Sequence, residues 1–193
     1  MIIYLYTNDN QSRRITMQIL SYVLSLAGLL SMIIASLVKG DRMKTILFLV
    51  FCGNAFVATS YLLGGSGING AAACYLGAVQ TLINYFFDSK NKPLPKWLIS
   101  LYALAIIILN IWVAKGVTAL GLLVIVASLT FILCIGQKNG AKYRFWTLVN
   151  MLLWCTYDIL SASYSVLLTH ALQLGFVVIG MFVHDRKNGS VQN

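Results

Sequence analysis

Seven apolar stretches of about twenty residues, joined by short polar connections, constrain this sequence more than any other feature. A helix that crosses the hydrocarbon core of a bilayer needs about 20 mostly apolar residues. Each stretch is apolar on nearly all sides and does not alternate between polar and apolar residues, which excludes the strands of a β-barrel. A spanning segment must also satisfy its backbone hydrogen bonds internally, as a helix does. The sequence therefore predicts seven transmembrane helices, at Thr16–Val38, Met43–Leu63, Ile68–Phe87, Trp97–Ala114, Val117–Gly136, Tyr143–Ser161 and Tyr164–Val183.

Composition excludes the main alternatives to a membrane protein. Of the 193 residues 59% are hydrophobic, and a soluble domain of this size could not bury so much apolar surface. The net charge of +9 is spread over the connections, which argues against a nucleic-acid partner. The connections are too short to hold a soluble domain, so we expect one all-α membrane domain over residues 1–193. Thr7–Arg14 is interpreted as a brief polar tail before the first span.

The distribution of lysine and arginine predicts the orientation in the membrane. With seven spans, three of the 14 basic residues, Arg13, Arg14 and Lys115, fall on the side of the N-terminus. The other eleven fall on the opposite side: Lys39, Arg42, Lys44, Lys90, Lys92, Lys96, Lys138, Lys142, Arg144, Arg186 and Lys187. Because cytoplasmic connections carry the excess of lysine and arginine, we expect the N-terminus outside and the C-terminus in the cytoplasm. Such a basic fringe also suits anionic lipid headgroups.

The first three and the last three spans share short sequence patterns. Similar basic, glycine-containing segments, Lys39–Lys44 and Lys138–Lys142, precede the second and the sixth span. Inside these spans, Asn54 and Tyr61 have the same spacing as Asn150 and Tyr157. Two such three-helix units, joined by one linker helix, would run parallel, which is the arrangement of SWEET transporters. The predicted architecture is a 3+1+3 bundle, with repeats at 16–87 and 117–183, a linker helix at 97–114 and a cytoplasmic tail at 184–193.

Polar side chains inside the spans are the candidate binding residues. Asp158, the one acidic residue within a span, must face a partner, a cavity or water, because a carboxylate at the bilayer centre is costly. The alternative is an interfacial Asp158 that reaches the outer surface. Polar and aromatic residues recur on the same helix face and together suit a small polar solute. The candidate substrate-binding residues are Asn54, Tyr61, Gln80, Asn84, Asn150, Trp154, Tyr157, Asp158, His170 and Gln173.

Structural roles compete with ligand binding at these positions. Polar side chains that hydrogen-bond across helices stabilise bundles without a ligand, and Asn54 and Asn150 fit either role. His170 could relay protons with Asp158, but we favour a histidine that is hydrogen-bonded to a neighbouring helix. The cysteines have no C-x-x-C spacing and are interpreted as buried thiols: Cys52, Cys74, Cys134 and Cys155. We expect no metal site, no cofactor and no enzyme activity, because no ligand cluster or nucleophile–base pair is visible.

Several short motifs resemble the YgjV family of bacterial inner-membrane proteins. They are Leu62-Leu63-Gly64, Gly70-Ala71-Ala72-Ala73, Gly77-Ala78-Val79-Gln80-Thr81-Leu82-Ile83 and Trp154-Cys155-Thr156-Tyr157-Asp158, the last of which leads to Ser163. The resemblance covers nearly the whole chain and implies a multi-pass protein of the bacterial inner membrane. It also implies distant similarity to the SWEET, PQ-loop and PnuC-like (MtN3-like) transporters. Relatives tend to have arginine at position 80, an amide at 158 and an acid at 170, where this chain has Gln80, Asp158 and His170.

The expected function is transport of a small solute by alternating access between the two repeats. The solute belongs to the sugar, nucleoside or vitamin class, and the absence of paired intramembrane acids favours a facilitator without a coupling ion. The alternative is a non-transporting membrane scaffold or regulatory protein, whose polar residues only pack helices. The expected partners are the lipid bilayer and the solute, with the oligomeric state left open. A solvent-reachable cavity bordered by Asn54, Asn150, Trp154 and Asp158 would favour transport.

Overall fold

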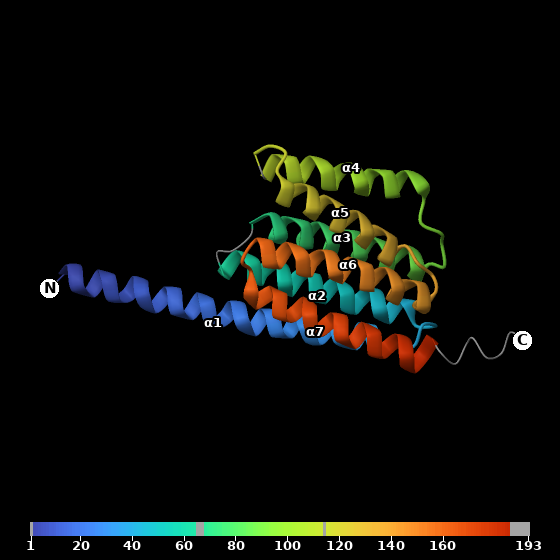
Figure 1. Ribbon diagram of the computed structural model, residues 1–193, viewed down its shortest axis with the longest axis horizontal. Coiled ribbons are helices and arrows are strands. Elements are labelled where there is room, and N and C mark those ends of the chain that lie inside the picture. The colour runs from blue at the N-terminus through green and yellow to red at the C-terminus, as the bar shows by residue number, and fades with distance from the viewer. Residues whose placement is uncertain (1, 65–67, 114, 186–193) are drawn as a thin grey trace, which may run out of the picture.

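Seven consecutive helices, running up and down side by side, make up the described part of the chain, residues 2–64, 68–113 and 115–185 (Figure 1). In this computed structural model, all regular structure within these ranges is helical. The α-helices are α1 (Ile2–Leu37), α2 (Met43–Gly64), α3 (Ile68–Ser89), α4 (Lys96–Val113), α5 (Ala119–Ile135), α6 (Gly140–Leu160) and α7 (Tyr164–Gly180). A π-helical turn, η1 (Met181–Asp185), continues α7.

The helix ends are set by capping residues as well as by hydropathy. Apart from the beginning of α1, the predicted and the observed ends differ by at most three residues. Asn139 caps α6, because its Oδ1 accepts a hydrogen bond from the Ala141 amide at 2.8 Å. Thr118 caps α5 in the same way, with its Oγ1 3.0 Å from the Gly121 nitrogen. The cap lets α6 begin three residues before its apolar stretch.

The polar tail predicted at Thr7–Arg14 is helical and continuous with the first span, because α1 begins at Ile2. This segment holds neither glycine nor proline, so the helix that the apolar stretch forms can extend through it. At 1.5 Å per residue, the 36 residues of α1 span about 54 Å, which exceeds the hydrocarbon core of a bilayer. Accordingly, α1 projects well beyond its neighbours (Figure 1). Arg13 and Arg14, in the first half of α1, are exposed.

Four helices are long and apolar enough to cross a membrane: Gln11–Leu37, Met43–Gly64, Lys96–Val113 and Val166–Asp185. Ala119–Ile135 is a shorter apolar helix. Large apolar side chains such as Leu104, Ile108 and Trp112 are exposed on the outside, which suits a surface in contact with lipid. Helices α3 and α6 carry more polar side chains, and the bundle buries them.

Six helices form a closed ring, and α4 lies beside it. Helix α2 packs between α1 and α3, and α6 packs between α5 and α7. The ring closes through contacts of α1 with α7 and of α3 with α5. Helix α4 lies at the edge of the bundle and packs mainly against α3 and α5 (Figure 1). Helices α1–α3 and α5–α7 are thus two groups of neighbours that meet along two seams.

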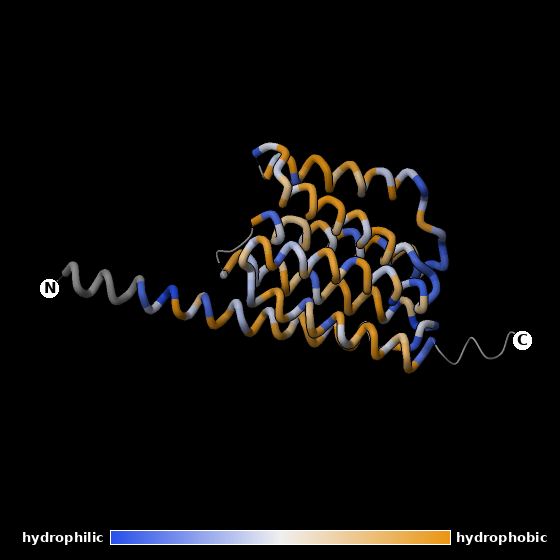
Figure 2. The backbone as a smooth tube through the Cα atoms, viewed as in Figure 1, coloured by the Kyte–Doolittle hydropathy of each residue, from blue (hydrophilic) through white to orange (hydrophobic). Residues whose placement is uncertain are grey.

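The two ends of the bundle differ in charge. At one end, the basic end, α1, α3, α5 and η1 finish and α2, α4 and α6 begin, and Figure 2 shows hydrophilic segments concentrated there. The described basic residues at this end are Lys39, Arg42, Lys44, Lys90, Lys92, Lys96, Lys138, Lys142 and Arg144. The opposite end, the far end, carries Lys115 in the α4–α5 connection. Arg186 and Lys187 lie outside the described residues, and the tail predicted at 184–193 begins inside η1, which includes His184 and Asp185.

Gly140→Ala is expected to lower the melting temperature, because a Cβ on Gly140 would lie 2.3 Å from the Cα of Gly40. Overpacking of this kind costs about 1–3 kcal/mol. The matched control is Gly175→Ala in α7, where a Cβ meets nothing within 4 Å and alanine is the better helix former. Thermal unfolding of the purified variants in one detergent measures both. Equal melting temperatures for Gly140→Ala and the wild type would mean that the two connections do not touch.

Candidate functional site

A small cavity lies in the middle of the helix ring. Its volume is about 40 Å³, which is room for about three water molecules. All seven helices contribute to its wall, α4 only through Ile106. The polar lining consists of Asn54, Gln80, Ser128, Thr147, Asn150, Thr169, His170 and Gln173. The remaining lining includes Met32, Val50, Val57, Phe131, Tyr143, Met151 and Trp154.

The predicted site residues divide into those that line the cavity and those packed beside it. Asn54, Gln80, Asn150, Trp154, His170 and Gln173 line it, and Tyr61, Asn84, Tyr157 and Asp158 do not. Asn84 is a structural link, because its Nδ2 donates to the Ile135 carbonyl at 3.0 Å and its Oδ1 accepts from the Tyr102 hydroxyl at 3.2 Å. The Tyr157 ring supports the cavity wall by packing edge-on against Trp154, with ring centroids 5.5 Å apart.

Asp158 connects three helices at the side of the cavity nearer the far end. Its Oδ1 accepts a hydrogen bond from the Tyr61 hydroxyl of α2 at 3.1 Å, and its Oδ2 lies 2.6 Å from Nδ1 of His170 in α7. Trp154 lies against the His170 ring, with centroids 5.7 Å apart. The alternative of an interfacial Asp158 that reaches the surface is wrong, because the residue is completely buried. The carboxylate therefore finds its partners inside the bundle, one from each three-helix group.

Asn150 and Asn54 both line the cavity but bond differently. The Asn150 amide donates to the Ala127 carbonyl at 2.6 Å and to the Thr130 hydroxyl at 3.0 Å, which ties α6 to α5. The Asn54 amide donates within its own helix, to the Val50 carbonyl at 3.0 Å. Asn150 thus has a packing role in addition to its place at the cavity. The protein thus uses both N–H groups of the Asn150 amide and one of the two of Asn54.

Gln80 in α3 is the exception among the polar residues of the cavity. It is 1% exposed, and both its Oε1 and its Nε2 are buried without a hydrogen-bond partner. No other cavity-lining residue in the described ranges leaves a buried side-chain nitrogen or oxygen in this state. A buried polar group without a partner costs about 1–3 kcal/mol. A guest molecule that offers both a donor and an acceptor would remove this cost.

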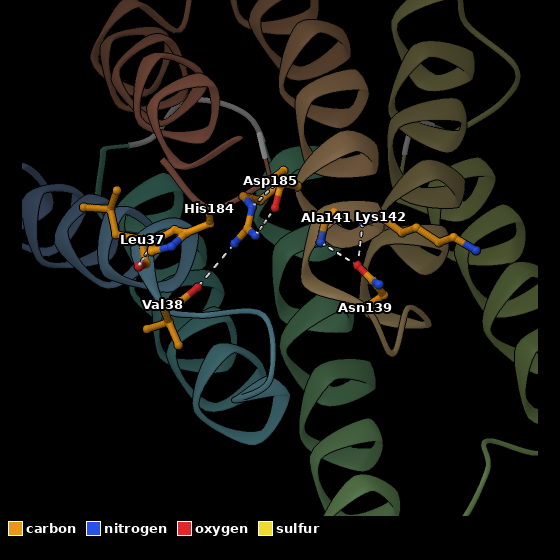
Figure 3. Close-up of polar contacts among 8 residues, drawn as sticks. Leu37, Val38, Asn139, Ala141, Lys142, His184 and Asp185 are labelled. Carbon is orange, nitrogen blue, oxygen red and sulfur yellow. Dashed lines mark hydrogen bonds and ion pairs between the residues drawn. The ribbon is translucent and has the colours of Figure 1, made fainter. Parts of the chain in front are cut away.

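A second polar cluster lies at the basic end (Figure 3). Arg144 is 2% exposed and binds Asp185 with two nitrogens, Nε at 3.0 Å from Oδ2 and Nη2 on Oδ1. Its Nη1 also donates to the Val38 carbonyl at 3.3 Å, and Nε2 of His184 lies 3.0 Å from the Leu37 carbonyl. The cluster joins the end of α1 to α6 and η1. The sequence did not indicate this cluster, because Arg144 was interpreted only as one of the basic residues of the cytoplasmic side and Asp185 fell in the predicted tail.

Two native thiols lie at opposite ends of the same cavity. Cys74, in the first third of α3, is toward the far end, and Cys134, next to the last residue of α5, is toward the basic end. Both are buried, in agreement with their interpretation as buried thiols, whereas Cys52 and Cys155 are half-buried. Within the described ranges, no group of three histidine, cysteine or acidic residues could hold a metal ion.

Comparison with known proteins identifies the family. The model of the family Imp-YgjV, described as a bacterial inner membrane protein, matches residues 11–188. The chain belongs to the YgjV family. No curated protein and no solved structure matches it. Membership of the YgjV family, together with four apolar helices of spanning length, makes this a multi-pass protein of the bacterial inner membrane, with the lipid bilayer as its surroundings.

Asp158→Ala is expected to destabilise the protein strongly, because it leaves the Tyr61 hydroxyl and the His170 ring buried without their partner. A buried polar group left without a partner costs about 1–3 kcal/mol, and Asp158→Ala leaves two, whereas Tyr61→Phe removes one hydrogen bond and costs about 1 kcal/mol. Asp41→Ala, at an exposed position of the basic end, is the control. Thermal unfolding in detergent gives the order of stabilities. A melting temperature of Asp158→Ala equal to that of the control would contradict the proposed cluster.

Proposed function

We propose that this YgjV-family protein is a small-solute transporter that works by alternating access between the groups α1–α3 and α5–α7. The observation that carries the proposal is the cavity. It lies where the two groups meet, and both groups contribute amide side chains to its wall, whereas the hydroxyl and aromatic side chains come from α5–α7. In a membrane protein, polar side chains that face a central cavity mark the paths of solutes.

The proposal includes seven transmembrane spans in a 3+1+3 arrangement. The polar side chains of α3 and α6 face the bundle interior, which lets these helices cross the bilayer beside the four apolar ones. Two contacts support a parallel repeat. Gly40 and Gly140, from connections of similar sequence, are in direct backbone contact, and Asn54 and Asn150 line the same cavity. Helix α4, at the edge of the bundle, is then the linker.

Orientation follows from charge. We assign the basic end to the cytoplasm and the far end to the periplasm, because lysine and arginine accumulate in cytoplasmic connections. The N-terminus is then outside.

The two polar clusters supply the gates that alternating access requires. On the far side, the Tyr61–Asp158 bond links α2 to α6. At the basic end, the bonds of Arg144 to Val38 and of His184 to Leu37 link α1 to α6 and η1. The cavity lies between them and is narrow while both are formed. We propose facilitated diffusion without chemistry, because the described cavity wall contains no acidic residue that could bind a coupling cation.

The native thiols test alternating access without knowledge of the solute. In a Cys52→Ser, Cys155→Ser background, Cys74 should react with a small membrane-impermeant thiol reagent from the periplasmic side and Cys134 from the cytoplasmic side. Spheroplasts and inverted vesicles provide the two sides, and Lys92→Cys and Val117→Cys, at exposed positions of the connections, serve as positive controls. If both cavity thiols stay unreactive while the controls react, the bundle centre is static and a scaffold role replaces transport.

Arg144→Gln is expected to open the basic end, because it removes the charge that binds Asp185. A variant that favours the inward-open state should label faster at Cys134 from the cytoplasmic side and more slowly at Cys74 from the periplasmic side. The charge reversal Arg144→Asp with Asp185→Arg should restore part of the wild-type pattern. Arg42→Gln, exposed at the same end, is the matched control. Faster labelling of both thiols at once would indicate loosening of the fold and would argue against a gate.

A further inference from the structure

We infer that the cavity takes an uncharged, planar molecule with an amide-type edge: a carboxamide, a cyclic amide or a nucleobase. The inference rests on the proposed transport function and narrows its substrate class, which the sequence left open between sugars, nucleosides and vitamins. The observation that points to it is the pair of unpartnered polar atoms of Gln80.

The side chain of Gln80 specifies what it can bind. Its carbonyl oxygen accepts and its amino group donates, and the two lie on one edge of a planar group. Both atoms are buried without a protein partner, and the residue lines the cavity. A molecule with a donor and an acceptor side by side satisfies both atoms with two parallel hydrogen bonds, as adenine does with amide side chains.

Several of the other polar groups of the cavity already bond within the protein. The amides of Asn54 and Asn150 donate to backbone carbonyls, and the Thr147 hydroxyl donates to the Tyr143 carbonyl at 2.8 Å. Nδ1 of His170 is engaged with Asp158. A sugar carries hydroxyl groups around its whole ring, and those that face the apolar part of the wall would lose water here without a replacement. Gln80 lines the cavity with two buried polar atoms that lack a partner, which favours a ligand that is polar along one edge.

Charge and shape of the wall agree with this class. No lysine, arginine, aspartate or glutamate lines the cavity within the described residues, so a carboxylate or phosphate would enter without a counter-charge. Phe131, Tyr143 and Trp154 offer flat apolar surface for a planar ring. At about 40 Å³ the cavity is smaller than such a ring, so binding requires the two helix groups to move apart. A bound ligand should therefore change the reactivity of Cys74 and Cys134.

Four probes test the inference on the purified full-length protein: benzamide, benzoate, uracil and glucose. Benzamide and benzoate share the same ring, but benzamide carries a neutral amide where benzoate carries a charged carboxylate. We expect benzamide and uracil to slow labelling of Cys74 and Cys134 in a saturable way and to raise the melting temperature, and benzoate and glucose to do neither. Benzoate as effective as benzamide, protection by glucose alone, or no effect of any probe would each overturn the inference.

Gln80→Met is the decisive variant, because it keeps the length of the side chain and removes both polar atoms. It should weaken benzamide and uracil about 5- to 150-fold, the discrimination of a bidentate pair. Without a probe it should melt no lower than the wild type, since it removes a buried group that has no partner. Gln137→Met, outside the cavity, is the matched control. Unchanged probe affinity in Gln80→Met would contradict the inference. If neither Cys74 nor Cys134 reacted from its own side of the membrane, transport itself would be contradicted. The two failures are therefore distinguishable.

Discussion

Lipid offers no hydrogen bonds, and this constraint decides where the polar side chains of the helices lie. Asp158 shows the effect most clearly. A carboxylate facing the hydrocarbon is costly, so α6 turns it inward, where Tyr61 of α2 and His170 of α7 bind it. The same requirement buries Arg144, which lies at the other end of α6 from Asp158. Its guanidinium group pairs with Asp185. With the polar residues inward, the outer surface is left to leucine, isoleucine and aromatic side chains, and the ring of six helices acquires a polar centre.

Helix positions could be predicted because hydropathy acts locally. The stretch Met43–Leu63 became α2 with one residue added, and the stretch beginning at Tyr164 became α7. Two helix ends could not be predicted from hydropathy. Helix α1 extends through Thr7–Arg14 because helix propagation needs no apolar residue, and α6 begins at Gly140 because Asn139 caps it. Hydropathy indicates where lipid contacts a helix, whereas propensity and capping decide where the helix ends.

Site residues were predictable only as far as helical periodicity reaches. The i, i+4 relation of Asn150 and Trp154 correctly placed both on the face that lines the cavity. Whether a polar group has a partner depends on other helices. The sequence could not indicate that the Asn84 side chain bonds to Ile135, 51 positions away, while the side chain of Gln80, one turn earlier on the same helix, has no partner. The difference between a packing residue and a ligand-binding one is therefore a tertiary property. For Gln80 it is the feature on which the proposed ligand class rests.

In the proposed repeat, the two three-helix groups differ in chemistry, and the difference lies in α6. The spacing that relates Asn54 to Asn150 relates Leu62 to Asp158, so the acid that forms the far-side contact exists in the second half only. Arg144, which forms the contact at the basic end, belongs to α6 as well. The two residues are 14 positions apart, or about 21 Å along the helix. One rigid helix thus carries both contacts, and a tilt of α6 about the cavity moves its two ends in opposite directions. Such a tilt would release one contact while pressing the other closed, which is the coupling that alternating access demands.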